Sequence, residues 1–318
     1  MDSLKEFLDA KEVEYEINIP LSKKTWVKTG GECAYWIVPQ SVMQMTEVCR
    51  YMYVNKVEFD IVGQTSNMFF HSTYHPQVVV STLKVNHYEI KEDVITCDCG
   101  ALVVKLAKDC LSRGYAGFYG LTGLPGTVAA SVSNNAGCFD CSISSMLVDA
   151  ECLFPDGTIR KVCPDELHFS RRSSALKRKE LKCVILSVTL CPSRASSIEE
   201  ETAKAHKAMD HRRNHQERNL PNLGSVFCRM SLKRNVRNIV SVSVARIQSI
   251  LGISEYMRVF KRMQLALYGY RDLDPYISDK NIDIFIWRDS GAEEAFERYK
   301  QFMKAAYKKL SIEIEEKA

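Results

Sequence analysis

Residues 117–137, GFYGLTGLPGTVAASVSNNAG, constrain the fold more than any other part of the chain. Five glycines and three alanines lie within this one segment, far from either end and without a low-complexity repeat. Because glycine loses the most conformational entropy on folding, such a cluster indicates that the backbone passes very close to something. The remaining sequence must show what that neighbour is.

Length and composition predict an ordinary globular protein. The 318 residues suffice for about two domains, and 46% of them are hydrophobic while 26% are charged. A net charge of +4 is too small to indicate nucleic-acid binding. The first 18 residues are charged throughout, and no stretch reaches the ~18 apolar residues that a membrane span needs. We therefore expect a cytoplasmic protein that binds neither nucleic acid nor a membrane.

The twelve cysteines are interpreted as reduced thiols, because no secretory signal is present and most lie in apolar surroundings. Two close pairs, Cys97–Cys99 and Cys138–Cys141, suggest a metal or redox site as an alternative. Neither pair is matched by a second pair at the spacing of a zinc site, so we predict no metal.

Periodicity predicts alternating helices and strands. Helical spacing marks 41–56, 101–114, 196–218 and 291–310. Strand patterns mark 59–63, 77–83, 184–190 and 283–287, with hairpins at 88–100 and 146–162. The second hairpin turns at Pro155-Asp156-Gly157, residues typical of tight turns. The fold class is therefore α+β, with a smaller lobe after the first two-thirds of the chain.

Two loops follow strand-like runs and expose backbone N–H groups: Gly63–Asn67 and Gly123–Thr127. Successive amides in such loops form concave nests that bind anions, and small neighbours let a phosphate approach. Neither loop contains the lysine of a Walker motif or matches GxGxxG. A diphosphate held by neutral amides and hydroxyls is one interpretation. Tight turns, with alanines packing a helix on a sheet, are the other.

Read in order, several short motifs together resemble one known family. They are Pro20-Leu21, Thr25, Gly30-Gly31, Ala34, Gly63 with Ser66-Asn67, the Gly-Leu-Pro-Gly-Thr-Val run at 123–128, Asn135-Ala136-Gly137, Phe169 with Arg172, Ser174 and Lys177, and Pro221 with Gly224-Ser225-Val226-Phe227. This set resembles the UDP-N-acetylenolpyruvoylglucosamine reductase (UDP-N-acetylmuramate dehydrogenase) family, of its shorter variety. The resemblance extends over about residues 15–228.

The resemblance implies a p-cresol-methylhydroxylase-type FAD-binding fold. Two α/β subdomains, 1–76 and 77–192, are expected to hold the flavin, and a smaller α+β lobe, 193–318, is expected to close over a UDP-sugar. FAD should bind non-covalently, since the 63–67 loop has no histidine or cysteine. NADPH is implied as the hydride donor, and the product UDP-N-acetylmuramate belongs to peptidoglycan (cell wall) synthesis. We expect a monomer.

The same resemblance implies roles for individual residues. Ser225 is the proton donor and Arg172 the cation that stabilises enolate charge; both are predicted to be catalytic. Arg171 and Arg213 are predicted to bind substrate. The predicted cofactor-binding residues are Gly63, Gln64, Thr65, Ser66, Asn67, Gly123, Leu124, Pro125, Gly126, Thr127, Asn135, Ala136, Gly137 and Ile185. The alternatives without a functional role are a turn at Gly224-Ser225 and solvated basic surfaces around Arg171, Arg172 and Arg213.

Several positions depart from the family's pattern. Thr65 and Ala129–Ala130 stand where the family has glycines, and Arg171 stands where it has a tyrosine. The family's C-terminal strand carries a catalytic glutamate, whereas an ungapped alignment puts Lys317 there, with Glu315 and Glu316 beside it. The third catalytic group is therefore either shifted in register or lost.

These departures keep two further functions open. One is a flavin oxidase or dehydrogenase of the same fold with another substrate. The other is a catalytically degenerate homologue that binds a nucleotide without turnover.

Overall fold

The structure is a computed structural model that describes residues 2–253 and 255–318. Two compact units make up the chain. Unit 1 comprises Met1–Thr25, Gly30–Thr65 and Ser72–Asp210, and unit 2 comprises Trp26–Thr29, Ser66–His71 and His211–Ala318. The boundary thus falls inside the first predicted loop, between Thr65 and Ser66.

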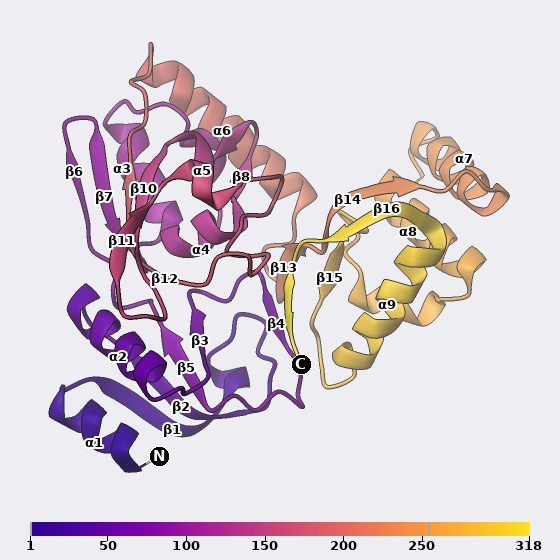
Figure 1. Cartoon of the computed structure of the whole chain (residues 1–318). Coiled ribbons are helices and arrows are strands. Elements are labelled where there is room, and N and C mark those ends of the chain that lie inside the picture. Colours follow the sequence, from indigo (N-terminus) through magenta and orange to yellow (C-terminus); the bar gives the residue numbers. More distant parts are fainter. Residues whose placement is uncertain (1, 254) are drawn as a thin grey trace. The chain divides into compact units, whose positions relative to one another are not determined.

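The first half of unit 1 is a four-stranded sheet with two helices (Figure 1). Its elements are α1 (Asp2–Ala10), β1 (Glu14–Pro20), β2 (Glu32–Val38), α2 (Val42–Val54), β3 (Phe59–Val62) and β5 (Val78–Ser81). The strand order is β1-β2-β5-β3, with β1 antiparallel to β2 and the remaining pairs parallel. Helix α2 begins at Ser41, whose hydroxyl accepts the Gln44 N–H at 3.2 Å, as helix N-caps commonly do.

The second half of unit 1 is a five-stranded antiparallel sheet in the order β11-β10-β12-β7-β6. Its elements are β6 (Tyr88–Lys91), β7 (Val94–Asp98), α3 (Val103–Ser112), α4 (Val128–Asn134), β8 (Gly137–Cys138), β9 (Cys141–Ser142), β10 (Leu147–Leu153), β11 (Ile159–Val162), α5 (Pro164–Leu167), β12 (Val184–Leu190) and α6 (Ile198–His215). The β10–β11 turn has Gly157 at φ +83°, and Asp156 accepts the Thr158 N–H at 2.9 Å. This confirms the predicted turn.

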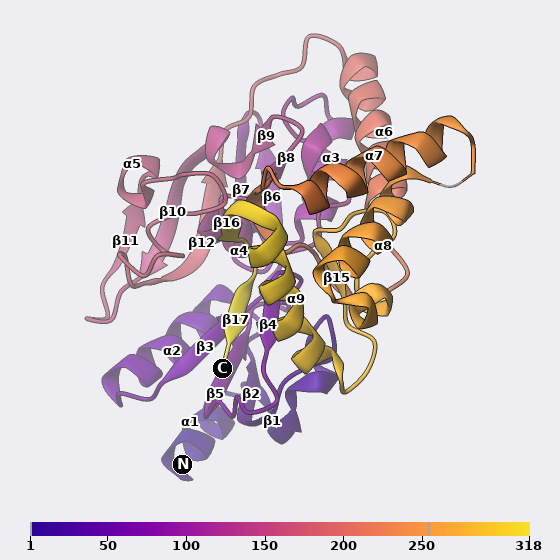
Figure 2. The ribbon, with the colours of Figure 1, turned by 90° about the vertical axis from the view of Figure 1, so that its right-hand side faces the viewer.

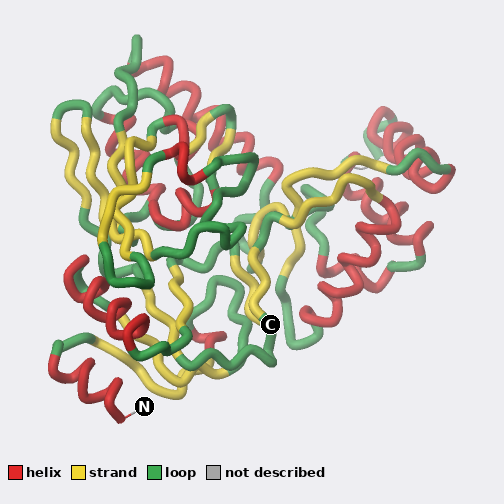
Figure 3. The backbone as a smooth tube through the Cα atoms, viewed as in Figure 1, coloured by secondary structure: helices red, strands yellow, loops and turns green. Residues whose placement is uncertain are grey.

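Unit 2 packs helices on short strand pairs (Figures 2 and 3). Its elements are β4 (Met68–Phe70), β13 (Asn222–Ser225), β14 (Phe227–Leu232), α7 (Val236–Ile250), α8 (Tyr256–Tyr268), β15 (Ile284–Ile286), α9 (Ala292–Ala306), β16 (Tyr307–Ile312) and β17 (Glu315–Lys317). The pairs are β13–β15, β14–β16 and β4–β17. Phe285, Phe296, Tyr299 and Phe302 form the centre of its core.

The predicted helices and strands are confirmed as elements, with shifted ends. The predicted helix 291–310 stops at Ala306, because the chain continues as β16 and pairs with β14. Strand β5 pairs with β2 and β3 in the first sheet. The domain limits 1–76, 77–192 and 193–318 stay a prediction. In the part of the chain that the structure describes, no helix is long and apolar enough to cross a membrane.

Candidate active site

The two predicted cofactor loops contact each other within unit 1. A β-carbon added to Gly63 would lie 2.6 Å from Oγ1 of Thr127, so this close approach requires glycine. The Gln64 side chain accepts the Gly126 N–H at 2.6 Å. Segments about sixty residues apart in the sequence therefore form one surface, as a ligand that spans both loops would require.

The backbone of these loops is held in uncommon conformations. Gly123 has φ +74° and Gly126 has φ +130°, and the Gly126 carbonyl accepts the Val103 N–H at 3.1 Å. Thr65 has φ +54°, a left-handed conformation that β-branched residues rarely adopt. This backbone conformation indicates local strain at the loop. Leu124 is half-buried and Pro125 is exposed.

The turn that carries Arg172 is bonded to the end of α4. Ser170 and Ser173 exchange main-chain hydrogen bonds of 3.0 and 3.1 Å around Arg171 and Arg172, and Arg172 has φ +56°. Asn135, left-handed at the end of α4, donates its side-chain N–H to the Ser170 carbonyl at 2.9 Å. Arg172 is half-buried and Arg171 is exposed. The predicted Asn135–Gly137 segment and the predicted arginines therefore lie together.

At two glycines of residues 117–137, the close neighbour is another part of the protein itself. An added β-carbon would lie 2.0 Å from the Cys138 carbonyl oxygen at Gly120 and 2.1 Å from the Cys141 carbonyl oxygen at Gly137. The close neighbour at these two positions is the β8–β9 hairpin. Packing inside the protein therefore explains the glycines at these two positions.

The residues present fit FAD at the loops. Oδ1 of Asn135 is buried and has no hydrogen-bond partner among the described residues, so a donor from a bound group can satisfy it. Ala136 is half-buried beside it. Ile185, also predicted to bind the cofactor, lies on β12 in the main hydrophobic core and is 8% exposed. Ser66 and Asn67 belong to unit 2, where Asn67 donates to the Glu313 carbonyl at 3.2 Å.

Ser225 ends β13 in unit 2 and is half-buried. It pairs with Ile284 of β15 across a register shift. The preceding Gly224 has φ +72°, and an added β-carbon there would meet nothing within 4 Å. Space is therefore free on the side of the Gly224 main chain where a side chain would lie.

Asp283 is a carboxyl beside Ser225 that the sequence did not indicate. Its carboxylate accepts the Phe227 N–H at 3.0 Å, the Ser225 hydroxyl is close enough to lower its pKa, and the residue is 6% exposed. Burial raises the pKa of Asp283 to about 7, with help from the nearby Glu313 charge and against these hydrogen bonds. The sequence signal that could have indicated Asp283 was its position, as one acidic residue at the start of an apolar strand.

The C-terminal segment also brings a different glutamate to Ser225 than expected. Glu313 donates its N–H to the Val226 carbonyl at 2.8 Å, next to Ser225. In contrast, Glu315 and Lys317 form an ion pair, and Glu316 forms ion pairs with Lys300 (2.8 Å) and His71 (3.5 Å). Glu313 is thus a further candidate for the C-terminal acid beside Glu315 and Glu316, because its main chain bonds Val226 next to Ser225.

A cluster of His71, Glu297 and Glu316 has its potential ligand atoms within 4.8 Å of one another. Lys300 lies in the same cluster, with its ammonium 2.7 Å from Glu297 and 2.8 Å from Glu316. A cation already neutralises these carboxylates, so we assign no metal to them.

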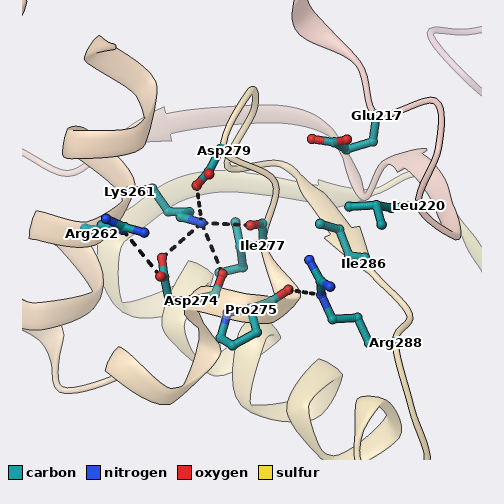
Figure 4. A pocket seen from close by; sticks show the side chains of 10 residues that line it. All are labelled: Glu217, Leu220, Lys261, Arg262, Asp274, Pro275, Ile277, Asp279, Ile286 and Arg288. Carbon is teal, nitrogen blue, oxygen red and sulfur yellow. Dashed lines mark hydrogen bonds and ion pairs between the residues drawn. The ribbon is translucent and has the colours of Figure 1, made fainter. Parts of the chain in front are cut away.

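Unit 2 has a cavity of about 220 Å³ (Figure 4). Inside it, the Lys261 ammonium bonds the Ile277 carbonyl at 2.9 Å and lies 3.0 Å from Asp274 and 2.7 Å from Asp279. Burial opposes ionisation of Asp279, but its bond to Lys261 holds the pKa below its usual value. These charges bind one another and stabilise the 274–279 loop. Arg213 lies exposed on α6, and its carbonyl accepts a bond from Lys280 at 3.0 Å.

Comparison with known proteins identifies relatives of this chain. Residues 33–162 match a family model described as an FAD binding domain. A UDP-N-acetylenolpyruvoylglucosamine reductase from Halalkalibacterium halodurans is 32% identical over 229 residues, which cover 71% of this chain and 75% of the relative. A protein of that name from Caldicellulosiruptor saccharolyticus is 28% identical over 222 residues, which cover 70% and 71%.

A solved structure shows the same fold. UDP-N-acetylenolpyruvylglucosamine reductase from Thermus caldophilus aligns with a TM-score of 0.66 over 96% of this chain and 99% of that one, at 19% identity. The fold and the matched domain define an FAD-binding flavoprotein of the α+β class. The chain belongs to the UDP-N-acetylenolpyruvoylglucosamine reductase family.

This membership confirms the predicted family and the p-cresol-methylhydroxylase-type fold, and with them an oxidoreductase that uses FAD. NADPH as the reductant follows from the family. The roles of individual residues stay predictions.

Proposed function

We propose that this protein uses NADPH to reduce UDP-N-acetylglucosamine enolpyruvate to UDP-N-acetylmuramate. Bound FAD supplies the two-electron transfer from NADPH to the enolpyruvyl group. The observation that carries the proposal is the surroundings of Ser225, a half-buried residue with two carboxyl-bearing residues close by. The names of the relatives supply the substrate class.

Ser225 donates the proton that completes the reduction. Hydride arrives at one carbon of the enolpyruvyl group, and a proton must reach its neighbour. A serine hydroxyl is a weak acid, so short reach and neighbouring groups matter more than its own pKa.

Glu313 is the third catalytic group in this proposal, in place of Glu315 or Glu316. Its main chain bonds Val226, its side chain is half-buried, and its charge acts on Asp283. Glu315 and Glu316 are engaged by the neighbouring cations Lys317 and Lys300. The predicted register shift is therefore preferred over loss of the acid.

Arg172 stabilises the negative charge that develops beside the substrate carboxylate. Its guanidinium is always charged and can hold a carboxylate with two parallel hydrogen bonds. The bonded turn at Ser170–Ser173 fixes the start of its side chain. Arg171 and Arg213 are both exposed and are proposed to bind the UDP diphosphate.

The test is NADPH consumption by the purified protein with and without the enolpyruvyl sugar. We expect a yellow protein whose NADPH consumption depends on the sugar. Consumption that ignores the sugar but requires oxygen would instead identify a flavin oxidase. A colourless protein without turnover would identify the degenerate homologue. The cytoplasmic location and the monomeric state stay predictions, and gel filtration tests the latter.

A further inference from the structure

Asp283 is fixed against the Ser225 segment by its main chain and by its side chain. Its carbonyl accepts the Val226 N–H at 2.9 Å, and its carboxylate accepts the Phe227 N–H at 3.0 Å. The Ser225 hydroxyl is close enough to this carboxylate to lower its pKa. Asn281 accepts the Asp283 N–H at 3.0 Å. These contacts hold Asp283 against the Ser225–Phe227 segment.

The groups around Asp283 favour its protonated form. Those that face it in the described part of the chain are Glu313, from the segment between β16 and β17, Tyr299 of α9 and Tyr307 of β16. Burial raises the pKa of both tyrosines, so they stay neutral near pH 7. Burial and the Glu313 charge together oppose ionisation of Asp283 and bring its pKa to about 7. Protonated and ionised forms therefore coexist near neutral pH.

The protonation state of Asp283 decides where the Ser225 proton points. An ionised carboxylate can only accept, so the Ser225 hydroxyl donates to Asp283 and its proton is directed inward. A protonated carboxyl can donate to Ser225 Oγ, which leaves the Ser225 proton free to point away from Asp283.

We propose that Asp283 is the positioning residue that supplies Ser225 with its proton. This inference rests on the proposed function. As the Ser225 O–H bond breaks and a C–H bond forms on the substrate, the Asp283 O–H bond breaks and a new O–H bond forms on Ser225. The electron pair of the Asp283 O–H bond stays on the carboxylate, and the negative charge of the enolate passes to Asp283. Water then returns a proton to Asp283 before the next turnover.

The test follows reoxidation of the reduced holoprotein. The protein is reduced without oxygen and mixed rapidly with UDP-N-acetylglucosamine enolpyruvate between about pH 5.5 and about pH 8.5. The wild-type rate should fall as the pH rises through about 7, because ionised Asp283 cannot donate. Asp283→Asn keeps the shape of the side chain but removes the proton, so reoxidation should be roughly 10–100-fold slower and independent of pH.

Two controls accompany this variant. Asp289→Asn removes an exposed carboxylate just after β15, which bonds the Tyr276 hydroxyl at 3.0 Å, and should keep the wild-type profile. Difference infrared spectra measure the carboxyl group without turnover. A protonated-carboxyl band that titrates near pH 7 should occur in the wild type and in Asp289→Asn, but not in Asp283→Asn.

A wild-type rate that does not change with pH overturns the inference, even if Asp283→Asn fails to fold. An Asp283→Asn protein that keeps the wild-type pH profile overturns it as well. If NADPH reduces the wild-type flavin but the enolpyruvyl sugar never reoxidises it, both the proposed function and this inference fail. Reoxidation with the wrong pH profile contradicts the Asp283 role alone.

Discussion

The loops of unit 1 and the Ser225 region of unit 2 are built from different parts of the chain. In the loops, main-chain shape dominates: Gly63 contacts Thr127, and Gly126 lies at φ +130° and bonds Gln64. In the Ser225 region, side-chain acids dominate, with Asp283 buried beneath the hydroxyl. Steric constraints on the main chain therefore determine the structure of the loops, whereas charged side chains determine the properties of the Ser225 region.

This difference separates two kinds of experimental effect. None of the predicted cofactor-binding residues carries an ionisable side chain, so substitutions in the loops should change FAD content or folding at every pH. Substitutions near Ser225 should leave FAD in place and change rates, pH profiles or pH-dependent stability.

The largest effect is expected for Gly120→Ala. The added methyl group would lie 2.0 Å from the Cys138 carbonyl oxygen, so main chain must move. We expect a loss of more than about 3 kcal/mol in the free energy of unfolding, with little soluble yellow protein. Soluble expression and flavin absorbance measure this. A yellow variant of wild-type stability would show that the hairpin contact is not required.

Ser225→Ala should follow, because it removes the proposed proton donor. Flavin reoxidation by the enolpyruvyl sugar should slow by roughly 10²–10⁴-fold, while FAD content and reduction by NADPH stay unchanged. Rapid mixing of the two half-reactions separates these steps. Reoxidation at the wild-type rate would remove Ser225 from the mechanism.

Arg172→Lys should raise the barrier of the oxidative half-reaction by about 2–4 kcal/mol, since lysine cannot hold a carboxylate with two parallel bonds. Reduction by NADPH should be slowed less. The two half-reactions are compared by rapid mixing. Equal slowing of both steps by Arg172→Lys would instead indicate shared phosphate binding.

Asp283→Asn should change how stability depends on pH. The folded pKa of Asp283 is raised from 3.8 to about 7, so the folded state holds a proton that the unfolded state releases. Its contribution is complete below the unfolded pKa and is lost as the pH rises through 7, by about 2 kcal/mol between pH 5 and pH 7. Urea unfolding followed by tryptophan fluorescence should show this slope in the wild type and a weaker slope in the variant. Parallel slopes would contradict the raised pKa.

The smallest effect is expected for Gly224→Ala. Its added β-carbon would meet nothing within 4 Å, so only the left-handed backbone at φ +72° opposes it. We expect a cost of about 1 kcal/mol in the free energy of unfolding, with FAD content unchanged. A cost as large as that of Gly120→Ala would mean that the open space beside Ser225 is filled.

Sequence patterns predicted the long periodic elements well. Helix α3 and the β10–β11 hairpin carry local signals, an amphipathic repeat and a turn, which act within a few residues. The family motifs likewise identified Gly63 and Gly126, which the fold brings together.

The acids around Ser225 were not predictable in the same way. Asp283 reaches Ser225 because β13 pairs with β15 across a register shift, and Glu313 reaches Val226 through the segment between β16 and β17. Register between distant strands leaves little trace in a single sequence, and an irregularity of one residue moves every later side chain.

The pairing of β4 with β17 has a consequence for synthesis of the chain. Met68–Phe70 leave the ribosome early, but Glu315–Lys317, their parallel partners in a two-stranded sheet, are made only after nearly all the other residues. Both sheets of unit 1 have every strand available by residue 190, so they can form while translation continues. The β4 segment, in contrast, must wait through most of translation with its main-chain hydrogen-bonding groups uncovered, and chaperone binding during synthesis is expected to concentrate there.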